Sequence, residues 1–164
     1  MPLTRAERRS LIRRYAAGPG KLRAALRSAP KKALNWRPGK GKWTVHEVVC
    51  HCADSEMNAA ARIRYLVAEK NPVIIGYDQD AWAKILGYAK HPIAPALALI
   101  DAARANTTVL IRRLGGVAWK CAGTHTESGR YTAERWLENY ANHLEQHARQ
   151  IRRNVAAWKN ARRG

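Results

Sequence analysis

Four long segments of this chain carry apolar residues at the spacing of one α-helical face. In the segment 93–114 that face is formed by Ile93, Leu97, Ile100, Ile111 and Leu114. The four expected helical regions are residues 4–29, 44–69, 93–114 and 132–160. We find no internal repeat and no convincing strand pattern. These features predict an all-α protein, a four-helix bundle in which side chains from different helices face a common interior.

Capping residues and helix breakers mark the ends of these helices. Thr4 with Glu7, and Thr44 with Glu47, have the spacing of capping boxes. Gly18-Pro19-Gly20 predicts a break or kink in the first helix, because proline cannot donate to the helical hydrogen-bond ladder.

Two connections are expected to cover the bundle. Residues 72–92 form a long connection between the second and third long helices, and Gln79–Leu86 within it is predicted to be a short helix. Residues 117–131 are polar and contain glycine, which predicts a short hairpin or loop over one end of the bundle.

Length and composition limit the class of protein. The 164 residues suit one domain, residues 1–164, and no apolar run reaches membrane-spanning length. The basic N-terminus is not followed by an apolar stretch, unlike a secretory signal. Three cysteines do not form a disulfide framework. We therefore expect a cytoplasmic protein with reduced thiols and no membrane partner.

The net charge of +18 is concentrated at the two ends of the sequence. Residues 1–42 hold 13 Lys and Arg and one acid, residues 149–164 hold six and none, and the middle is neutral. Such ends are suited to non-specific binding of nucleic acid. No nucleic-acid motif accompanies them, so a solvated basic surface is the favoured interpretation and a nucleic-acid partner is the alternative.

His143 and His147 are the candidate metal ligands of the last helix. Residues four apart leave an α-helix on the same face, so both imidazoles can reach one ion. His51, which lies in a polar stripe of the second helix, is the best candidate for a third ligand. An isolated pair with this spacing is more often a solvated or core pair. The surrounding polar stripes favour the wall of an internal pocket.

Four neighbouring residues are candidates for chemistry. Asp54 or Glu47 would orient an imidazole or accept a proton, with Asp54 favoured because Glu47 serves the capping box. Tyr140, one turn before His143, would donate a proton to a bound group or simply pack. Arg62 would bind an anionic substrate group or form a surface ion pair.

The remaining cysteines and histidines are weaker candidates. Cys50 and Cys52 flank His51 but point in different directions on a helix, so they are expected to be small buried residues. Cys121 and His125 would approach the mouth of the pocket. His46 and His91 are expected to be surface or loop residues.

Several of these residues together resemble a known family. Trp43-Thr44-Val45, Val48-Val49, His51, Ala53-Asp54-Ser55 and Met57-Asn58 resemble the first signature of the DinB/YfiT-like superfamily. Gly76-Tyr77-Asp78 with Ala81-Trp82 resembles the loop of the YfiT-like branch. Tyr140, His143 and His147 resemble the signature of the last helix in the superfamily. The resemblance covers about residues 36–155.

The resemblance implies a four-helix bundle, a divalent metal held by His51, His143 and His147, and a homodimer in many members. It implies a small-molecule substrate attacked by water or by a low-molecular-weight thiol, as in a hydrolase or thiol S-transferase. Zinc is the default ion, and nickel or another first-row metal accepts the same ligands. Cys50 and Glu56 occupy positions where histidine occurs in the family, which predicts a different substrate.

Overall fold

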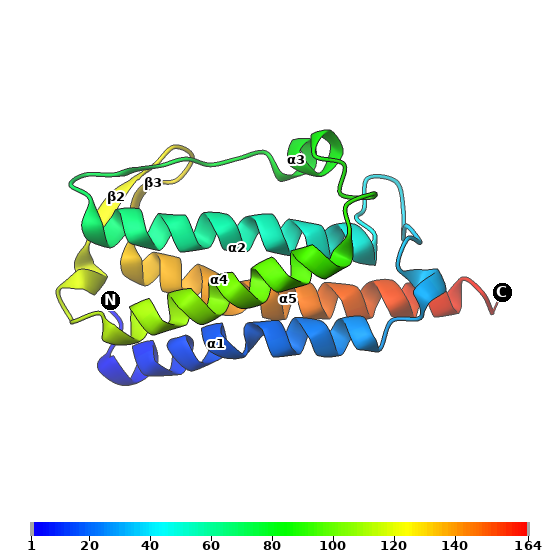
Figure 1. The fold of residues 1–164 in the computed structure, drawn as a ribbon, viewed down its shortest axis with the longest axis horizontal. Helices are drawn as coiled ribbons and strands as arrows, with labels where there is room; N and C mark the ends of the chain where they lie inside the picture. The colour runs from blue at the N-terminus through cyan, green and yellow to red at the C-terminus, as the bar shows by residue number, and fades with distance from the viewer. Residues whose placement is uncertain (1, 164) are drawn as a thin grey trace.

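A computed structural model describes residues 2–163 and contains a bundle of four long helices (Figure 1). The elements, in chain order, are α1 Arg5–Arg27, α2 Val45–Ala68, β1 Val73–Ile74, α3 Gln79–Ile85, α4 Ile93–Arg113, β2 Ala122–His125, β3 Gly129–Thr132 and α5 Ala133–Asn160. Two short 3₁₀ turns lie at Lys31–Ala33 and Ala118–Lys120. The predicted fold class is confirmed, and helix α3 lies in the long connection as expected.

Helices α1 and α5 run parallel to each other. Arg8 pairs with Glu134 near the start of both helices, and Lys21 pairs with Glu145 further along both. Helix α4 runs in the opposite direction, since Asp101 pairs with Arg23 of α1 whereas the later Arg104 contacts the earlier Tyr15. Helix α2 does too, since Trp136 of α5 contacts Ala59 whereas the later Asn154 contacts Trp43, just before the start of α2. Each helix of one parallel pair therefore lies against helices of the other pair around a shared interior.

Side-chain caps begin three of the long helices. The Thr4–Glu7 and Thr44–Glu47 capping boxes are both formed, and the Thr132 side chain accepts a hydrogen bond from the amide of Arg135. These caps pair amide groups that have no partner inside the helix. The two predicted capping boxes are confirmed.

Of the two alternatives predicted for the first helix, a break or a kink, the break is wrong, because α1 continues through Pro19. Proline removes the hydrogen bond that the Tyr15 carbonyl would accept in an unbroken ladder. Arg104 of α4 donates to that carbonyl instead, at 2.7 Å. Gly18 allows this approach, since an added Cβ would lie 3.1 Å from Leu144 and 3.3 Å from Arg104. The sequence Gly-Pro-Gly therefore serves close helix packing here.

A small three-stranded sheet covers the end of the bundle where α2 finishes. Strand β1 pairs in parallel with β2, and β2 pairs with β3 as an antiparallel hairpin. The hairpin was one of the two forms expected for residues 117–131, whereas the absence of strands elsewhere was a wrong prediction. Gly123 is required, because a Cβ there would lie 2.2 Å from the Pro72 carbonyl oxygen.

Buried apolar side chains fill the bundle on both sides of a polar layer. One cluster includes Trp136, Tyr15 and Ile63, and the other includes Leu22, Val48 and Ile151. Within residues 2–163, no helix is both long and apolar enough to cross a membrane.

Candidate metal centre

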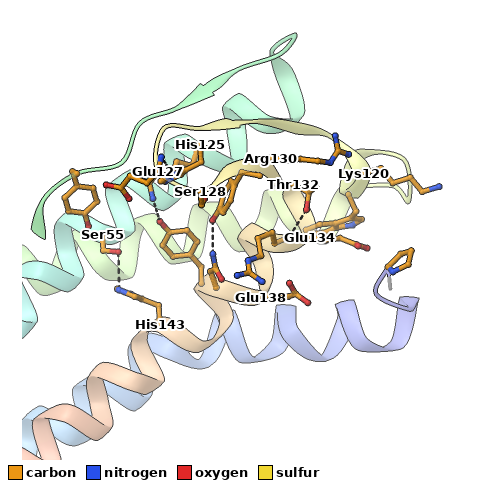
Figure 2. Close-up of a pocket in the computed structure, with 18 of the residues that line it drawn as sticks. Ser55, Lys120, His125, Glu127, Ser128, Arg130, Thr132, Glu134, Glu138 and His143 are labelled. Carbon is orange, nitrogen blue, oxygen red and sulfur yellow. Dashed lines mark hydrogen bonds between the residues drawn. The ribbon is translucent and has the colours of Figure 1, made fainter.

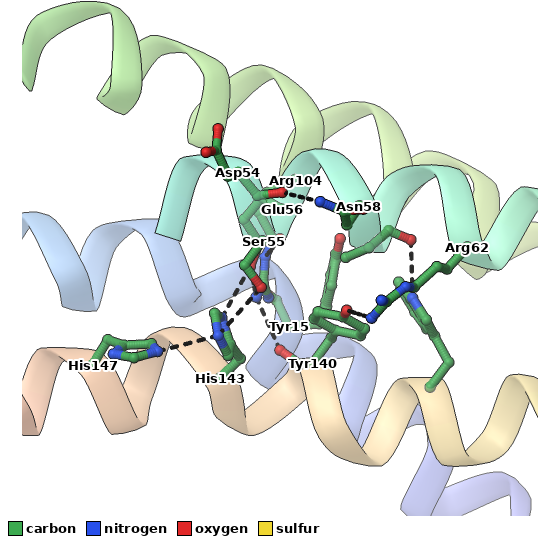
Figure 3. Close-up of polar contacts among 12 residues, drawn as sticks. Tyr15, Asp54, Ser55, Glu56, Asn58, Arg62, Arg104, Tyr140, His143 and His147 are labelled. Carbon is green, nitrogen blue, oxygen red and sulfur yellow. Dashed lines mark hydrogen bonds and ion pairs between the residues drawn. The ribbon is translucent and has the colours of Figure 1, made fainter. Parts of the chain in front are cut away.

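Helices α2 and α5 bring the three predicted histidines together. These helices are antiparallel, so His51 in the second turn of α2 faces the middle of α5, where His143 and His147 lie one turn apart (Figure 3 shows the α5 pair). One nitrogen of each ring lies within 4.8 Å of the others. The ring centroids of His51 lie 5.5 Å from His143 and 4.9 Å from His147. Three imidazoles are therefore within reach of one ion.

The burial of His51 makes its lack of hydrogen bonds informative. Its side chain is about 1% exposed, and neither ring nitrogen has a hydrogen-bond partner among the described residues. A buried polar atom without a partner costs roughly 1–3 kcal/mol. A cation bound by one of these nitrogens would remove that cost for the acceptor nitrogen.

The hydrogen bonds of the α5 pair favour the same interpretation. Nδ1 of His147 lies 2.8 Å from Oε1 of Gln150, an amide oxygen that only accepts, so Nδ1 carries the proton. Nδ1 of His143 faces the carboxylate of Glu56 at 3.6 Å. The Nε2 atoms of the two rings lie 3.1 Å apart, and with both protons on Nδ1 their lone pairs would face and repel each other. A cation between them would turn this repulsion into attraction.

The electrostatic surroundings keep two of the rings neutral. Burial lowers the pKa of His51 to about 2, with the neighbouring His147 and His143 adding to the effect. Burial, followed by the charge of His143, lowers the pKa of His147 to about 4. Metal coordination needs the unprotonated ring, so protons compete little for these two ligands at neutral pH.

A buried ion pair lies directly behind His143. Arg104 of α4 is 1% exposed and Glu56 of α2 is fully buried, and the guanidinium donates to both carboxylate oxygens, to Oε1 at 2.6 Å (Figure 3). Burial alone would raise the pKa of Glu56, but Arg104 and His143 hold it below its ordinary value. Arg104 also donates to the Tyr140 carbonyl at 2.9 Å. The pair thus connects His143 to all four long helices.

Glu56 and Arg104 were missed as site residues. The sequence feature that could have identified them is a charged residue on an otherwise apolar helix face. Arg104 lies on the same face of its helix as Ile100 and Ile111. Glu56 likewise shares a face with Cys52 and Ala59. A charged residue at such a position on two helices predicts a buried pair.

Asp54 lies away from the histidines. Its carboxylate accepts a hydrogen bond from the Tyr88 hydroxyl at 2.6 Å, and it lines a smaller cavity beside Cys50. Ser55, one residue later and about 100° further around α2, faces the site instead, with its hydroxyl 3.3 Å from Nε2 of His143. Glu47 is occupied by its capping box, as expected, and it also pairs with Arg37.

Tyr140 and Arg62 do lie beside the histidines. The ring of Tyr140 packs 5.9 Å from that of His143, and its hydroxyl accepts a hydrogen bond from Arg62 at 2.9 Å (Figure 3). Arg62 also donates to the Ile75 carbonyl at 2.5 Å. Among residues 2–163 it pairs with no carboxylate, so the surface ion pair considered for it is not formed.

A cavity of about 930 Å³ extends from His143, the one cluster histidine that lines it, under the small sheet (Figure 2). Ser55, Arg62, Tyr140 and His143 line its inner part, and the hairpin covers its outer part. His125 of the hairpin also lines the cavity, whereas Cys121 does not. Cys50 and Cys52 are buried, and burial raises the pKa of Cys50 to about 11, so neither resembles a reactive thiol.

Comparison with known proteins identifies the family. The sequence profile of the DinB superfamily matches residues 14–151. This chain belongs to the DinB superfamily.

Relatives of this DinB chain carry names that refer to metals. A Bacillus subtilis protein, "Putative metal-dependent hydrolase YfiT", is 31% identical over 134 residues, which cover 81% of this chain and 75% of that protein. An Oceanobacillus iheyensis protein also named "Putative metal-dependent hydrolase" is 37% identical over 111 residues. That match covers 68% of this chain and 64% of the relative.

Two solved structures resemble this DinB chain. YfiT of Bacillus subtilis, described as having "an unusual four-helix bundle topology", matches with a TM-score of 0.89 and 26% identity over 96% of this chain and 91% of that one. TT2238, described as a four-helix bundle protein, matches with a TM-score of 0.63 and 23% identity over 88% of this chain and 97% of that one. The second likeness concerns the fold alone.

Proposed function

We propose that this protein is a metal-dependent enzyme in which His51, His143 and His147 hold one divalent ion. The observation that carries the proposal is the convergence of three imidazoles, two of them with Nε2 atoms 3.1 Å apart and one buried without a hydrogen-bond partner. Zinc is the default ion for such ligands, and nickel or another first-row metal is the alternative. The names of the relatives support the same class of activity.

Three neutral ligands favour a catalytic over a structural site. Structural zinc sites use four protein ligands, whereas catalytic sites use three and leave a position for a reactant. When bound, such an ion supplies the Lewis acidity that makes water or a thiol nucleophilic at neutral pH. We infer attack by water on a small electrophilic substrate, with a low-molecular-weight thiol as the alternative nucleophile.

Other residues of the cavity would bind and orient the substrate. Burial raises the pKa of Tyr140, so its phenol stays protonated at neutral pH. Because its oxygen already accepts from Arg62, its own proton can be donated into the cavity. Arg62 would hold an anionic substrate group beside the histidines, since it has no carboxylate partner among the described residues. Glu56 would keep His143 in its orientation.

Metal analysis tests the ligand assignment. We expect purified protein to bind about one divalent ion per chain, and His143→Ala and His147→Ala to lose it. His91→Ala is the matched control, because this exposed histidine lies outside the cluster. Retention of the ion by both cluster variants would overturn the assignment.

The nucleophile is tested separately with the metal-loaded protein. Turnover of activated esters without added thiol, dependent on metal and reduced by Tyr140→Phe, would support hydrolysis. Turnover of alkyl halides or epoxides only when a thiol is present would support thiol transfer. Absence of both activities in protein that retains its ion would refute the enzymatic function while leaving the metal site intact.

A further inference from the structure

The fold joins two basic segments that are far apart in the sequence. Because α1 and α5 are parallel, both end at the same end of the bundle, together with the loop that leads into α2 (Figure 1). We call this surface, formed by residues 24–47 and 146–163, the basic pole. It holds twelve of the 30 Lys and Arg but only one of the twelve acids, Glu47.

The cations of the basic pole are exposed and almost all without carboxylate partners. Only Arg37 forms an ion pair in the described residues, with Glu47. The other eleven are all exposed, among them Lys31, Lys40, Arg152 and Arg163. Elsewhere on α1, Arg8, Arg14, Lys21 and Arg23 pair with carboxylates, whereas Arg5, Arg9 and Arg13 are exposed and form no ion pair in the described residues.

Residues 24–47 and 146–163 contact each other and so form one continuous surface. Asn154 of α5 donates to the Trp43 carbonyl at 2.9 Å, and Val155 belongs to the apolar cluster that Leu34 and Trp43 pack against. The cations are therefore carried on a fixed support. Positive side chains near a helix C-terminus do stabilise its dipole, but only within the last turn. Most of these eleven cations lie outside the last turns of α1 and α5, so the dipoles do not account for them.

We propose that the basic pole binds the phosphate backbone of a nucleic-acid duplex, without sequence selection. Unpaired cations gathered at one end of the bundle can replace the counterions of a duplex, which are released on binding. None of the large exposed apolar side chains, such as Ile85 or Val117, lies in the basic pole, so a membrane-inserting face is missing there. Trp36 and Trp158 are half-buried, which disfavours stacking with single-stranded bases.

Fluorescence anisotropy with a labelled 20-base-pair DNA duplex tests the proposal. We expect the full chain to bind at 50 mM KCl and to weaken steeply up to 300 mM. The variant R152Q/R153Q/R162Q/R163Q removes four charges from the basic pole. It should lose at least tenfold in affinity at 100 mM KCl, and its salt slope should fall by roughly 3–4, at about 0.9 per lost phosphate contact.

The matched control removes the same charge from the opposite end of the bundle. R5Q/R9Q/R112Q/R113Q replaces four exposed arginines and should change affinity less than threefold. Equal losses in the two variants would show a response to net charge alone and would overturn the proposal. So would absence of duplex binding, or binding to phosphatidylserine vesicles but not to the duplex. Since His143→Ala leaves the basic pole intact, its duplex affinity should be unchanged.

Discussion

Replacing Arg104 by methionine should cause a large loss of stability. The substitution leaves the charge of Glu56, which is fully buried, without its partner. Loss of one member of a buried ion pair costs about 3–5 kcal/mol. The Tyr15 carbonyl also loses its donor, which Pro19 cannot replace, at about 1–3 kcal/mol. The sum approaches the whole stability of a typical domain.

The double variant Glu56→Leu/Arg104→Met separates the ion pair from the other effects. With both charges gone, the Tyr15 carbonyl is left without a donor and the Tyr140 carbonyl loses its hydrogen bond from Arg104, so we expect a loss of about 1–3 kcal/mol. The double variant should therefore be more stable than Arg104→Met alone. Urea unfolding of metal-free protein at pH 7, followed by far-UV circular dichroism, measures the free energies.

The sign of the coupling decides this prediction. Glu56→Leu and Arg104→Met are also measured singly. If their losses of unfolding free energy simply add in the double variant, the side chains do not interact and the reasoning is refuted. A second measurement concerns His143: Glu56→Gln should weaken metal binding about 10–100-fold, the usual effect of losing a group that orients a ligand. Unchanged metal affinity would show that Glu56 serves stability alone.

Three further changes test individual contacts. Arg62→Gln should raise KM about tenfold for a carboxylate-bearing substrate and leave an uncharged analogue unaffected; equal effects on both would exclude an anion-binding role. Arg14 and Lys21 lower the pKa of Glu145 from 4.5 to about 2, so its stabilisation is present above pH 4.5 and is lost as pH falls towards 2. Unfolding of Glu145→Gln and the parent should therefore differ by on the order of 1 kcal/mol at pH 7, because both cations are half-exposed, and converge at pH 2; a constant difference would contradict this. Pro19→Ala should stabilise by only about 1 kcal/mol in urea unfolding, rather than the roughly 3 kcal/mol typical of a helix interior, because Arg104 already satisfies the Tyr15 carbonyl; a gain of 3 kcal/mol would refute that explanation.

Helix boundaries and the histidine cluster were predictable because both depend on local spacing. Capping boxes at Thr4 and Thr44 mark helix starts through residues three apart. His143 and His147 share a face at a separation of four. Each signal lies within one or two turns of a helix, where sequence spacing alone determines on which side of the helix a side chain lies.

The failures depend on partners from distant parts of the chain. The continuity of α1 relies on Arg104, 85 residues after Pro19 in sequence, which no local pattern near the proline contains. The two-residue strand β1 is too short to have a pattern and forms by pairing with β2. Whether Ser55 or Asp54 faces the histidines depends on how α2 is rotated about its axis, and packing against the other helices determines that rotation.

The parallel arrangement of α1 and α5 has a consequence for how the chain folds. Within the bundle, α1 has its most extensive contacts with α5, which is synthesised after the other three long helices. Contacts between such remote segments form slowly, because a long loop must close first. During synthesis the apolar side of α1, including Tyr15 and Leu22, lacks its main cover until the ribosome has released α5. We therefore expect truncation before residue 133 to give an aggregating product, and chaperone contact to centre on α1.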